Sequence, residues 1–410
     1  MVFDLQIHGF TNCIISDTLC DLSQNLPHWN TIPQTTIKVT NGKNTEHFSK
    51  PLKDLSGNLF LPAYEWGKKI DEGTYGKIYQ ANRKIYTKIP NENIDIHQFK
   101  YLSSDTVVIK ESHICLTPEE EKLPYITRKK IIENEIDTLM HEAVVLTLAY
   151  LAMKKANMEY AVPKVYEIFL HTKSDNSNIT QMSSLCITME YIKGDTLLKF
   201  MGNTFKKTTK EENSKHFLDF VKQLAEILNV LQKELRMNHR DIKVNNILLR
   251  TTCDTKNPVL VLIDYGFACI ANGEQKPDAE MSNIEAGTYF GSRYACFKQG
   301  RDMVQFLYSL HCHFPLDEYL SDDVLEFIKP WFLVDYKYGI ANLFHGLKPN
   351  GHHNDSRNKN LIYDEGIYLF LKRPEVDPIH CAPATILKNI ETFLNKRNLT
   401  NVKYTDLNSF

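Results

Sequence analysis

HRDIKVNNILL, at residues 239–249, places one acid, one base and one amide at fixed offsets. Asp241 can accept the proton of an attacking hydroxyl, Lys243 can neutralise a moving phosphoryl group, and Asn246 can supply a hard oxygen to Mg²⁺. A lone His-Arg-Asp triplet would carry little information. The spacing of these three groups, followed by Asp264-Tyr265-Gly266, indicates phosphoryl transfer.

Regular elements are predicted on both sides of this stretch. Apolar residues between Ser214 and Met237 recur every three or four positions, which predicts a helix with a buried stripe that leads into His239. Residues 258–263 are apolar and predict a buried strand that presents Asp264. The polar residues of interest are therefore expected on loops that buried elements hold in place.

With these residues in view, the chain resembles a eukaryotic-type protein kinase over roughly residues 65 to 310. The resemblance implies an α+β fold of two lobes, a small β-rich lobe and a larger helical lobe, with ATP and Mg²⁺ bound between them. It implies catalytic roles for Asp241 and Lys243 and makes Asn246 and Asp264 the metal ligands. Serine/threonine kinases carry Lys at the position of Lys243, so the resemblance favours a protein Ser or Thr hydroxyl as acceptor. The divergence is similar to that of kinases from large DNA viruses or protists.

Residues 69–81, KIDEGTYGKIYQA, resemble the glycine-rich loop that covers the ATP phosphates. Glycine lets backbone N–H groups approach phosphate oxygens without a Cβ in the way. Gly73 and Gly76 keep two glycines of the pattern, whereas Asp71 stands where the first glycine is expected. An acid at that position would weaken ATP binding if its side chain pointed inward.

A strand that ends in lysine follows this loop. Residues 107–110, VVIK, predict an apolar strand, and the resemblance implies that the Lys110 amine holds the α and β phosphates. The segment from Gly76 to Thr106 is longer than kinase small lobes usually need, and it is polar around residues 90–93. We therefore expect an inserted loop in this segment.

A long helix from about Thr127 to Lys155 should contain the glutamate that pairs with Lys110. Glu135 and Glu142 are both candidates, because residues seven positions apart lie on one face of a helix. Glu142 is the preferred partner, since it lies nearer to the strand that begins around residue 161.

Residues 185–195, LCITMEYIKGD, resemble the hinge that reads adenine through backbone groups. By position, Met189 is the gatekeeper, and the Glu190 carbonyl and the Ile192 amide face the base. Asp195 either reaches the ribose or caps the helix that follows. The resemblance also implies nucleotide contacts from further side chains, namely Ile70, Ile78, Val108 and Leu248.

The segment after Asp264 departs most from the family pattern. Gly287-Thr288 looks like the pair that precedes the substrate-docking loop, and Asp302 looks like the aspartate of a buried helix that anchors the catalytic loop. Residues 294–297, YACF, stand where Ala-Pro-Glu is expected. The glutamate that usually anchors the large lobe is therefore missing.

Length and composition are consistent with a two-lobed domain plus an extension. The 410 residues are 42% hydrophobic, which allows a large buried core. The expected divisions are an extension of unknown role at 1–62, a small lobe with insertions at 63–192, and a large lobe with a divergent C-terminal part at 193–410. A net charge of −2 gives no case for nucleic acid as a partner.

Membrane and redox signals are weak. The sequence contains no run of 18 apolar residues, so we expect no membrane span. The nine cysteines are odd in number and form no C-x-x-C pair, which argues against a disulfide framework and a zinc module. The expected location is the cytoplasm or another intracellular reducing compartment.

The prediction is an ATP-dependent serine/threonine protein kinase that uses Mg²⁺, and two alternatives stay open. One is a pseudokinase that acts as a nucleotide-binding or protein-binding module, which the missing glycine and glutamate favour. A chain released from catalysis need not keep its chemical groups, and this one keeps Lys110, Asp241, Lys243, Asn246 and Asp264. The other is a small-molecule kinase of the aminoglycoside or choline type. Those enzymes more often carry Gly than Arg before the catalytic Asp.

Overall fold

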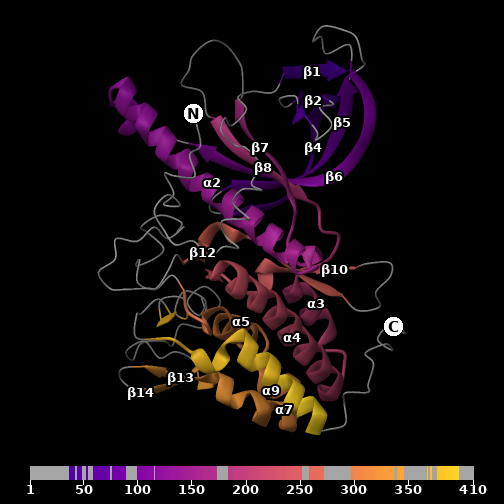
Figure 1. Ribbon diagram of the computed structural model, residues 1–410, viewed down its shortest axis with the longest axis vertical. Coiled ribbons are helices and arrows are strands. Elements are labelled where there is room, and N and C mark those ends of the chain that lie inside the picture. The colour runs from indigo at the N-terminus through magenta and orange to yellow at the C-terminus, as the bar shows by residue number, and fades with distance from the viewer. Residues whose placement is uncertain are drawn as a thin grey trace. The chain divides into compact units, whose positions relative to one another are not determined.

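The computed structural model describes residues 37–41, 44–48, 52–53, 59–73, 76–88, 99–114, 116–172, 183–251, 258–271, 297–336, 339–345, 367, 370–371 and 376–396 (Figure 1). These residues form two compact units. The described part of the first lies within Pro27–Ala143 and Lys164–Tyr191, and that of the second within Val144–Pro163 and Ile192–Phe410. The first unit is rich in strands and the second in helices, which confirms the predicted α+β class.

The first unit is built on one antiparallel sheet of eight strands in the order β1-β2-β4-β5-β6-β8-β7, with β3 paired to β4. The strands are β1 (Ile37–Asn41), β2 (Asn44–Phe48), β3 (Leu52–Lys53), β4 (Leu59–Gly73), β5 (Gly76–Lys88), β6 (Phe99–Ile114), β7 (Val165–Thr172) and β8 (Ser183–Glu190). Helix α2 (Tyr125–Lys155) follows β6 and contributes residues to both units. Its position in the sequence agrees with the predicted helix.

The long curved strands β5 and β6 in Figure 1 bear on one expectation. The sequence predicts an inserted loop in the segment 76–106. The strands β5 and β6 pair from Lys77↔Glu111 to Lys88↔Phe99, with a register shift between Ile85 and Tyr86. The residues 89–98 between them are not described, so the loop stays a prediction. Antiparallel strands tolerate one solvated face, so their sequence can be polar at alternate positions and look like a loop. The rings of Tyr86 and Tyr101 meet across this hairpin at 6.0 Å. The polar residues 90–93 lie outside the described residues.

One face of the sheet carries a buried apolar cluster. It consists of Tyr64, Ala81, Val107, Ile109, Phe169 and Cys186. The rings of Tyr64 and Phe169 stack with centroids 5.2 Å apart. Because successive side chains of a strand point to opposite faces, burial of Ile109 in this cluster puts Lys110 on the other face. The core packing of the sheet therefore decides where the lysine amine points.

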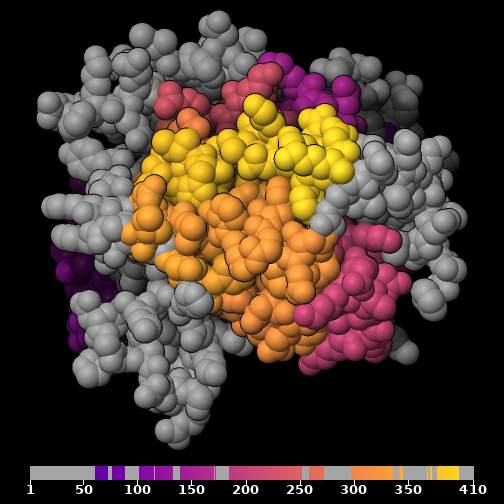
Figure 2. Space-filling view, turned by 90° about the horizontal axis from the view of Figure 1, so that it is seen from below, coloured from indigo at the N-terminus to yellow at the C-terminus, as the bar shows by residue number. Residues whose placement is uncertain are grey.

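The second unit is assembled from helices and short strand pairs. Its helices are α3 (Leu197–Thr204), α4 (Lys210–Leu235), α5 (Arg301–His313), α6 (Leu316–Tyr319), α7 (Asp322–Ile328) and α9 (Pro383–Lys396). Its strands pair as β9 (Met237–Asn238) with β12 (Cys269–Ile270), β10 (Ile247–Arg250) with β11 (Val259–Leu262), and β13 (Leu333–Tyr336) with β14 (Gly339–Asn342). Figure 2 shows α9 in yellow beside the orange residues that follow position 297.

Helix α4 is the central support of the catalytic loop. A capping box between Thr209 and Glu212 begins the helix, and Arg236 ends it in a left-handed conformation at φ 49°. The predicted apolar stripe is buried: Phe217, Val221, Leu224, Leu228, Leu231 and Leu235. Helix α9 packs against α4. The buried stripe fixes α4 in the core, and β9 carries the chain from its end to His239.

Three properties of the described residues bear on the sequence predictions. No helix among them is long and apolar enough to span a bilayer. In the same ranges, no group of three His, Cys, Asp or Glu side chains could hold a metal ion. Cys381 is a free thiol, whereas Cys269 is disulfide-bonded. The cysteine pattern, which predicts no disulfide framework, does not anticipate this bond.

Candidate active site

Asp302 holds the backbone of the catalytic loop, as the sequence predicts. Its Oδ2 accepts the His239 N–H at 2.9 Å, and its Oδ1 accepts the Arg240 N–H at 3.0 Å. Asp302 is completely buried in the first turn of α5. Arg240 adopts φ 69°, and Asp264 adopts φ 66°. Left-handed conformations of this kind are costly for residues other than glycine and are typical of functional sites.

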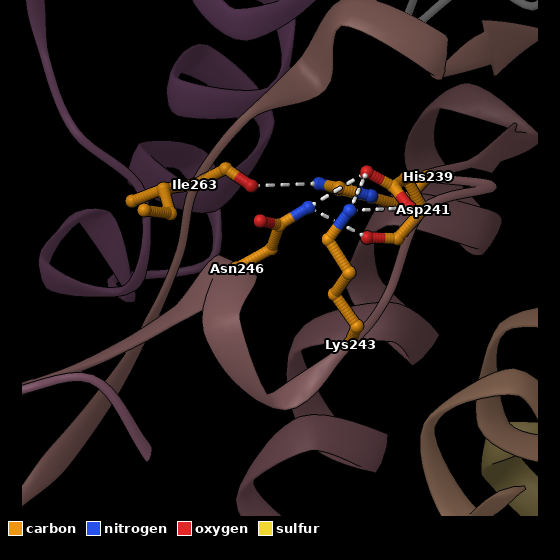
Figure 3. A network of polar contacts seen from close by, with 5 residues as sticks. All are labelled: His239, Asp241, Lys243, Asn246 and Ile263. Carbon is orange, nitrogen blue, oxygen red and sulfur yellow. Dashed lines mark hydrogen bonds and ion pairs between the residues drawn. The ribbon is translucent and has the colours of Figure 1, made fainter. Parts of the chain in front are cut away.

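Three of the predicted site residues lie together in the second unit, at the end of α4 (Figure 3). The Lys243 ammonium lies 3.2 and 2.9 Å from the two carboxylate oxygens of Asp241. The Asn246 Nδ2 donates to the Asp241 carbonyl and to its Oδ2, both at 2.9 Å. The acid is therefore held by a cation on one side and by an amide on the other.

Asn246 also meets the requirement of a metal ligand. With its nitrogen on Asp241, its amide oxygen faces away from the acid (Figure 3). Its backbone carbonyl accepts the Ile263 N–H at 3.0 Å, while the His239 ring lies 3.1 Å from the Ile263 carbonyl. Both backbone groups of Ile263 are thus hydrogen-bonded, which fixes the position of the chain directly before Asp264. An amide and a carboxylate oxygen are suitable donors for Mg²⁺.

Burial sets the protonation behaviour of this cluster. Burial raises the pKa of Asp241 above its ordinary value, while the charge of Lys243 and its hydrogen bond act in the opposite direction. Burial lowers the pKa of His239, so the neutral imidazole is favoured. The His239 ring packs against Tyr265 with centroids 4.7 Å apart. A more basic Asp241 is better suited to accept a proton from a hydroxyl.

The first unit contains the predicted ion pair. The Lys110 ammonium lies 2.7 and 2.6 Å from the two carboxylate oxygens of Glu142, and each side chain is 13% exposed. Both carboxylate oxygens are engaged, so of the two candidates the structure pairs Lys110 with Glu142. The side chain of Glu135 lies outside the described residues. The pairing agrees with the preferred assignment, and the catalytic role of the pair stays a prediction.

The described residues of the glycine-rich segment lie at the end of β4 and the start of β5. Gly73 pairs with Gly76 at the end of the ladder, and residues 74–75 lie outside the described residues. A Cβ on Gly76 would sit 2.2 Å from the Glu111 carbonyl oxygen, so only glycine fits there. The Asp71 side chain is exposed, and its carboxylate accepts the neighbouring Glu72 N–H at 2.8 Å.

The predicted nucleotide contacts of the first unit are distributed over four strands, β4, β5, β6 and β8. Ile78 pairs directly with Lys110, which puts both side chains on one face of the sheet. Val108 lies on β6 opposite Met189 of β8, and both are partly buried. Ile70 is 45% exposed. Ile78 is therefore positioned beside the lysine, whereas Ile70 lies at the surface.

The hinge residues continue from β8 into the second unit. The Glu190 N–H donates to the Lys164 carbonyl at 2.8 Å, and Ile192 is buried. Leu248 lies on β10 and forms a bridge with Thr196. A Cβ on Gly194 would sit 1.8 Å from the Leu249 carbonyl oxygen. This close approach of the hinge to β10 requires glycine, a feature that the sequence pattern does not reveal.

Asp195 does not cap the following helix. Thr196 is the N-cap of α3, and its side chain accepts the Lys199 N–H at 3.2 Å. The Asp195 carboxylate instead pairs with the Lys199 ammonium at 2.6 Å on the surface. Thr196 is the N-cap instead of Asp195 because it has the extended backbone of a cap and lies one residue closer to the helix. The ribose contact predicted for Asp195 stays a prediction.

Residues 272–296 lie outside the described residues, and with them Gly287-Thr288 and most of the segment that replaces Ala-Pro-Glu. The described residues continue from Phe297.

The sequence did not identify Asn238 and Lys298 as residues of the site. The side-chain amide of Asn238 forms hydrogen bonds with the backbone of Lys298. The only signal in the sequence was a polar residue directly before His239, which the structure buries on β9.

The lysine–glutamate pair of one unit and the Asp241–Lys243–Asn246 cluster of the other are the arrangements that the resemblance to protein kinases predicts. The comparison with protein families agrees, because residues 124–293 match the protein kinase domain. Over residues 124–293 the chain is therefore similar to the domain of the eukaryotic-type protein kinase superfamily.

Curated relatives are serine/threonine-protein kinases at low identity. The chain is 27% identical over 180 residues to a probable serine/threonine-protein kinase of Dictyostelium discoideum, which covers 42% of this chain and 14% of that protein. It is 31% identical over 113 residues to the serine/threonine-protein kinase CAK1 of Saccharomyces cerevisiae, covering 25% and 30%. It is 31% identical over 121 residues to a probable cell cycle serine/threonine-protein kinase of Encephalitozoon cuniculi, covering 27% and 23%. The matches therefore span less than a third of each relative.

Proposed function

We propose that this protein is an ATP-dependent serine/threonine protein kinase, which transfers the γ-phosphoryl group of Mg-ATP to a hydroxyl of a protein substrate. The observation that carries the proposal is the Asp241 carboxylate, held at 2.9 Å by both the Lys243 ammonium and the Asn246 amide. Serine/threonine acceptors are supported by Lys243 and by the relatives, which are named as serine/threonine-protein kinases.

In this proposal the catalytic loop orients the acceptor. Asp241 accepts a hydrogen bond from the substrate hydroxyl and takes its proton as the phosphoryl group is transferred. Lys243 keeps that carboxylate in place and balances negative charge on the phosphoryl oxygens. The backbone of the loop does not need to move, because Asp302 already holds it. Catalysis is therefore mainly positioning and charge neutralisation.

Lys110, Glu142 and Gly76 of the first unit would contribute to nucleotide binding. Lys110 donates to the phosphates, and Glu142 orients its ammonium. Gly76 lets the backbone of the loop approach the phosphates closely. Asn246 and Asp264 would hold Mg²⁺, which neutralises phosphate charge when it is bound.

A transfer assay tests the proposal. Purified protein is incubated with γ-labelled ATP, Mg²⁺ and a generic basic protein, beside an Asp264→Ala variant. We expect label on Ser and Thr of the basic protein with the wild type and almost none with the variant. Equal labelling by both proteins, or label on Tyr alone, would contradict the proposal.

A pseudokinase is the second candidate, and Asp71 is the residue that favours it. An acid in the glycine-rich segment opposes binding of the ATP phosphates by like-charge repulsion. In the structure its exposed carboxylate accepts a backbone N–H, which weakens this argument. The same assay separates the two candidates when an ATP titration accompanies it, because a pseudokinase would bind nucleotide without transferring phosphate.

A further inference from the structure

Lys298, close to the carboxyl end of the segment 272–296, has its ammonium buried in the second unit. The residue is 3% exposed. Its Nζ donates to the Leu371 carbonyl at 2.8 Å and to the Val376 carbonyl at 2.6 Å. An ammonium is stable inside a protein only where fixed acceptors replace water. The carbonyls of a segment more than 70 residues further along the chain provide these acceptors.

The backbone of Lys298 is held as firmly as its side chain. The Lys298 N–H donates to the Asn238 Oδ1 at 2.6 Å, and the Asn238 Nδ2 donates to the Lys298 carbonyl at 3.0 Å. The same Nδ2 also donates to the Asp302 Oδ2 at 3.0 Å. Asp302 in turn holds His239 and Arg240. Lys298 is thus connected to the catalytic loop through one amide and one carboxylate, all of them buried.

The neighbouring residues fit closely against the same distant segment. A Cβ on Gly300 would sit 1.7 Å from the Pro378 carbonyl oxygen. The Asp377 carboxylate accepts a hydrogen bond from the Gly300 backbone and lies within Coulombic range of Lys298. Figure 2 shows the yellow residues from 376 onward beside orange residues of this region. Leu371 and residues 376–378 therefore form a platform on which residues 298–300 are fixed.

We propose that Lys298 is a positioning residue for transfer to protein substrates. Its ammonium anchors residues 298–300 on Leu371 and residues 376–378. Through Asn238 and Asp302, the same anchor holds the backbone of the catalytic loop in a fixed position relative to residues 298–300. This inference rests on the proposed function.

The test compares Lys298→Met, which keeps the length of the side chain but removes its charge, with Lys298→Arg, which keeps donors for the carbonyls. Lys388→Met is the matched control, because Lys388 is exposed on the nearby helix α9. The measurements are kcat/KM for a protein substrate, KM for ATP, and hydrogen–deuterium exchange at residues 238–241 and 297–302.

We expect Lys298→Met to lower kcat/KM for the protein substrate by roughly 10- to 100-fold, the size of effect that follows from a small misplacement of reacting groups. The KM for ATP should stay unchanged, and exchange should rise in both segments. Lys298→Arg should recover most of the loss, and Lys388→Met should match the wild type.

Two results would overturn the inference. One is unchanged activity and exchange in Lys298→Met. The other is a loss that raises the KM for ATP equally and accelerates exchange throughout the second unit, since that pattern describes a merely structural residue. If Lys298→Met does not fold, Asp377→Asn replaces it, because it loosens the same contact from an exposed position, and it should give a smaller loss of the same pattern. If the wild type transfers no phosphate, the proposed function is wrong. The hydrogen–deuterium exchange measurements alone then test whether Lys298 anchors residues 297–302 and the catalytic loop.

Discussion

The Lys110 ammonium faces both oxygens of the Glu142 carboxylate, at 2.7 and 2.6 Å. The lysine comes from the sheet and the glutamate from α2, so this pair fixes the helix to the strand at one point. It also leaves the ammonium oriented by a partner instead of free to rotate. Replacement of the glutamate should therefore affect nucleotide binding more than folding.

Glu142→Gln should lower kcat/KM by roughly 10- to 100-fold, because the ammonium loses the charge that orients it. Steady-state kinetics with varied ATP would measure the change, and most of it should appear in the KM for ATP. Glu135→Gln is the matched control, since the partner of Lys110 is already known to be Glu142. Loss of activity in the control and not in Glu142→Gln would reverse the assignment.

Asp241→Ala, Asn246→Ala and Asp264→Ala should each reduce transfer by about 100- to 10,000-fold, because proton acceptance and metal binding use different groups on one transition state. The assay is incorporation of label into protein at saturating ATP. Asp317→Asn, a change of an exposed acid in α6, should be neutral. Activity near that of the wild type in Asp241→Ala would remove that residue from the catalytic role.

Tyr265→Phe should stabilise the protein. Tyr265 is completely buried, and no described residue makes a hydrogen bond with its hydroxyl. Burial of an unsatisfied hydroxyl costs about 1–3 kcal/mol, so the free energy of unfolding should rise by part of that amount. Burial also raises the pKa of Tyr265, so the hydroxyl stays protonated and the cost of burying it is not removed by ionisation. Urea unfolding at neutral pH measures the change.

The control for this prediction is Tyr64→Phe, which removes a hydroxyl that is equally buried but satisfied. The Tyr64 hydroxyl donates to the Glu167 Oε2 at 2.5 Å. Its loss should destabilise the protein by about 1–3 kcal/mol, because a buried carboxylate loses its donor. Opposite signs for the two variants are the expected result. A destabilised Tyr265→Phe would mean that its hydroxyl has a partner.

Asp219→Asn should stabilise the protein at neutral pH. Burial raises the pKa of Asp219 on α4, against the hydrogen bond that Gln223 donates. A carboxyl whose folded-state pKa is raised costs stability when it is ionised, and that cost disappears as the pH falls through the folded-state pKa. The amide oxygen of Asn keeps the bond from Gln223 and removes the charge.

Thermal unfolding from pH 7 down to pH 4 would test this prediction. The advantage of Asp219→Asn over the wild type should shrink as the pH falls. Glu211→Gln, in the exposed first turn of the same helix, should not raise the thermal stability, because a carboxylate at that position interacts favourably with the helix dipole. An advantage that grows toward acid pH would mean that the pKa of Asp219 is lowered by folding instead of raised.

Several parts of the fold and site could be predicted from the sequence, because they depend on spacing within one element. The stripe from Phe217 to Leu235 follows the helical period, so its burial needs no knowledge of the partner helices. The catalytic loop places Asp241, Lys243 and Asn246 within six residues, and their contact follows from that proximity. The extension of β5 to Lys88 and the start of β6 at Phe99 were not anticipated, because a half-solvated strand has the composition of a loop.

Tertiary structure decided what spacing leaves open. The helical period puts Glu135 and Glu142 on one face, and only the position of α2 against β6 selects Glu142. Asn238 and Lys298 are 60 residues apart, and no local pattern relates them. Hydrogen bonds and buried charges require partners within about 3 Å. Periodicity tells which side of an element is buried, whereas the partner across the core is fixed only when distant elements pack together.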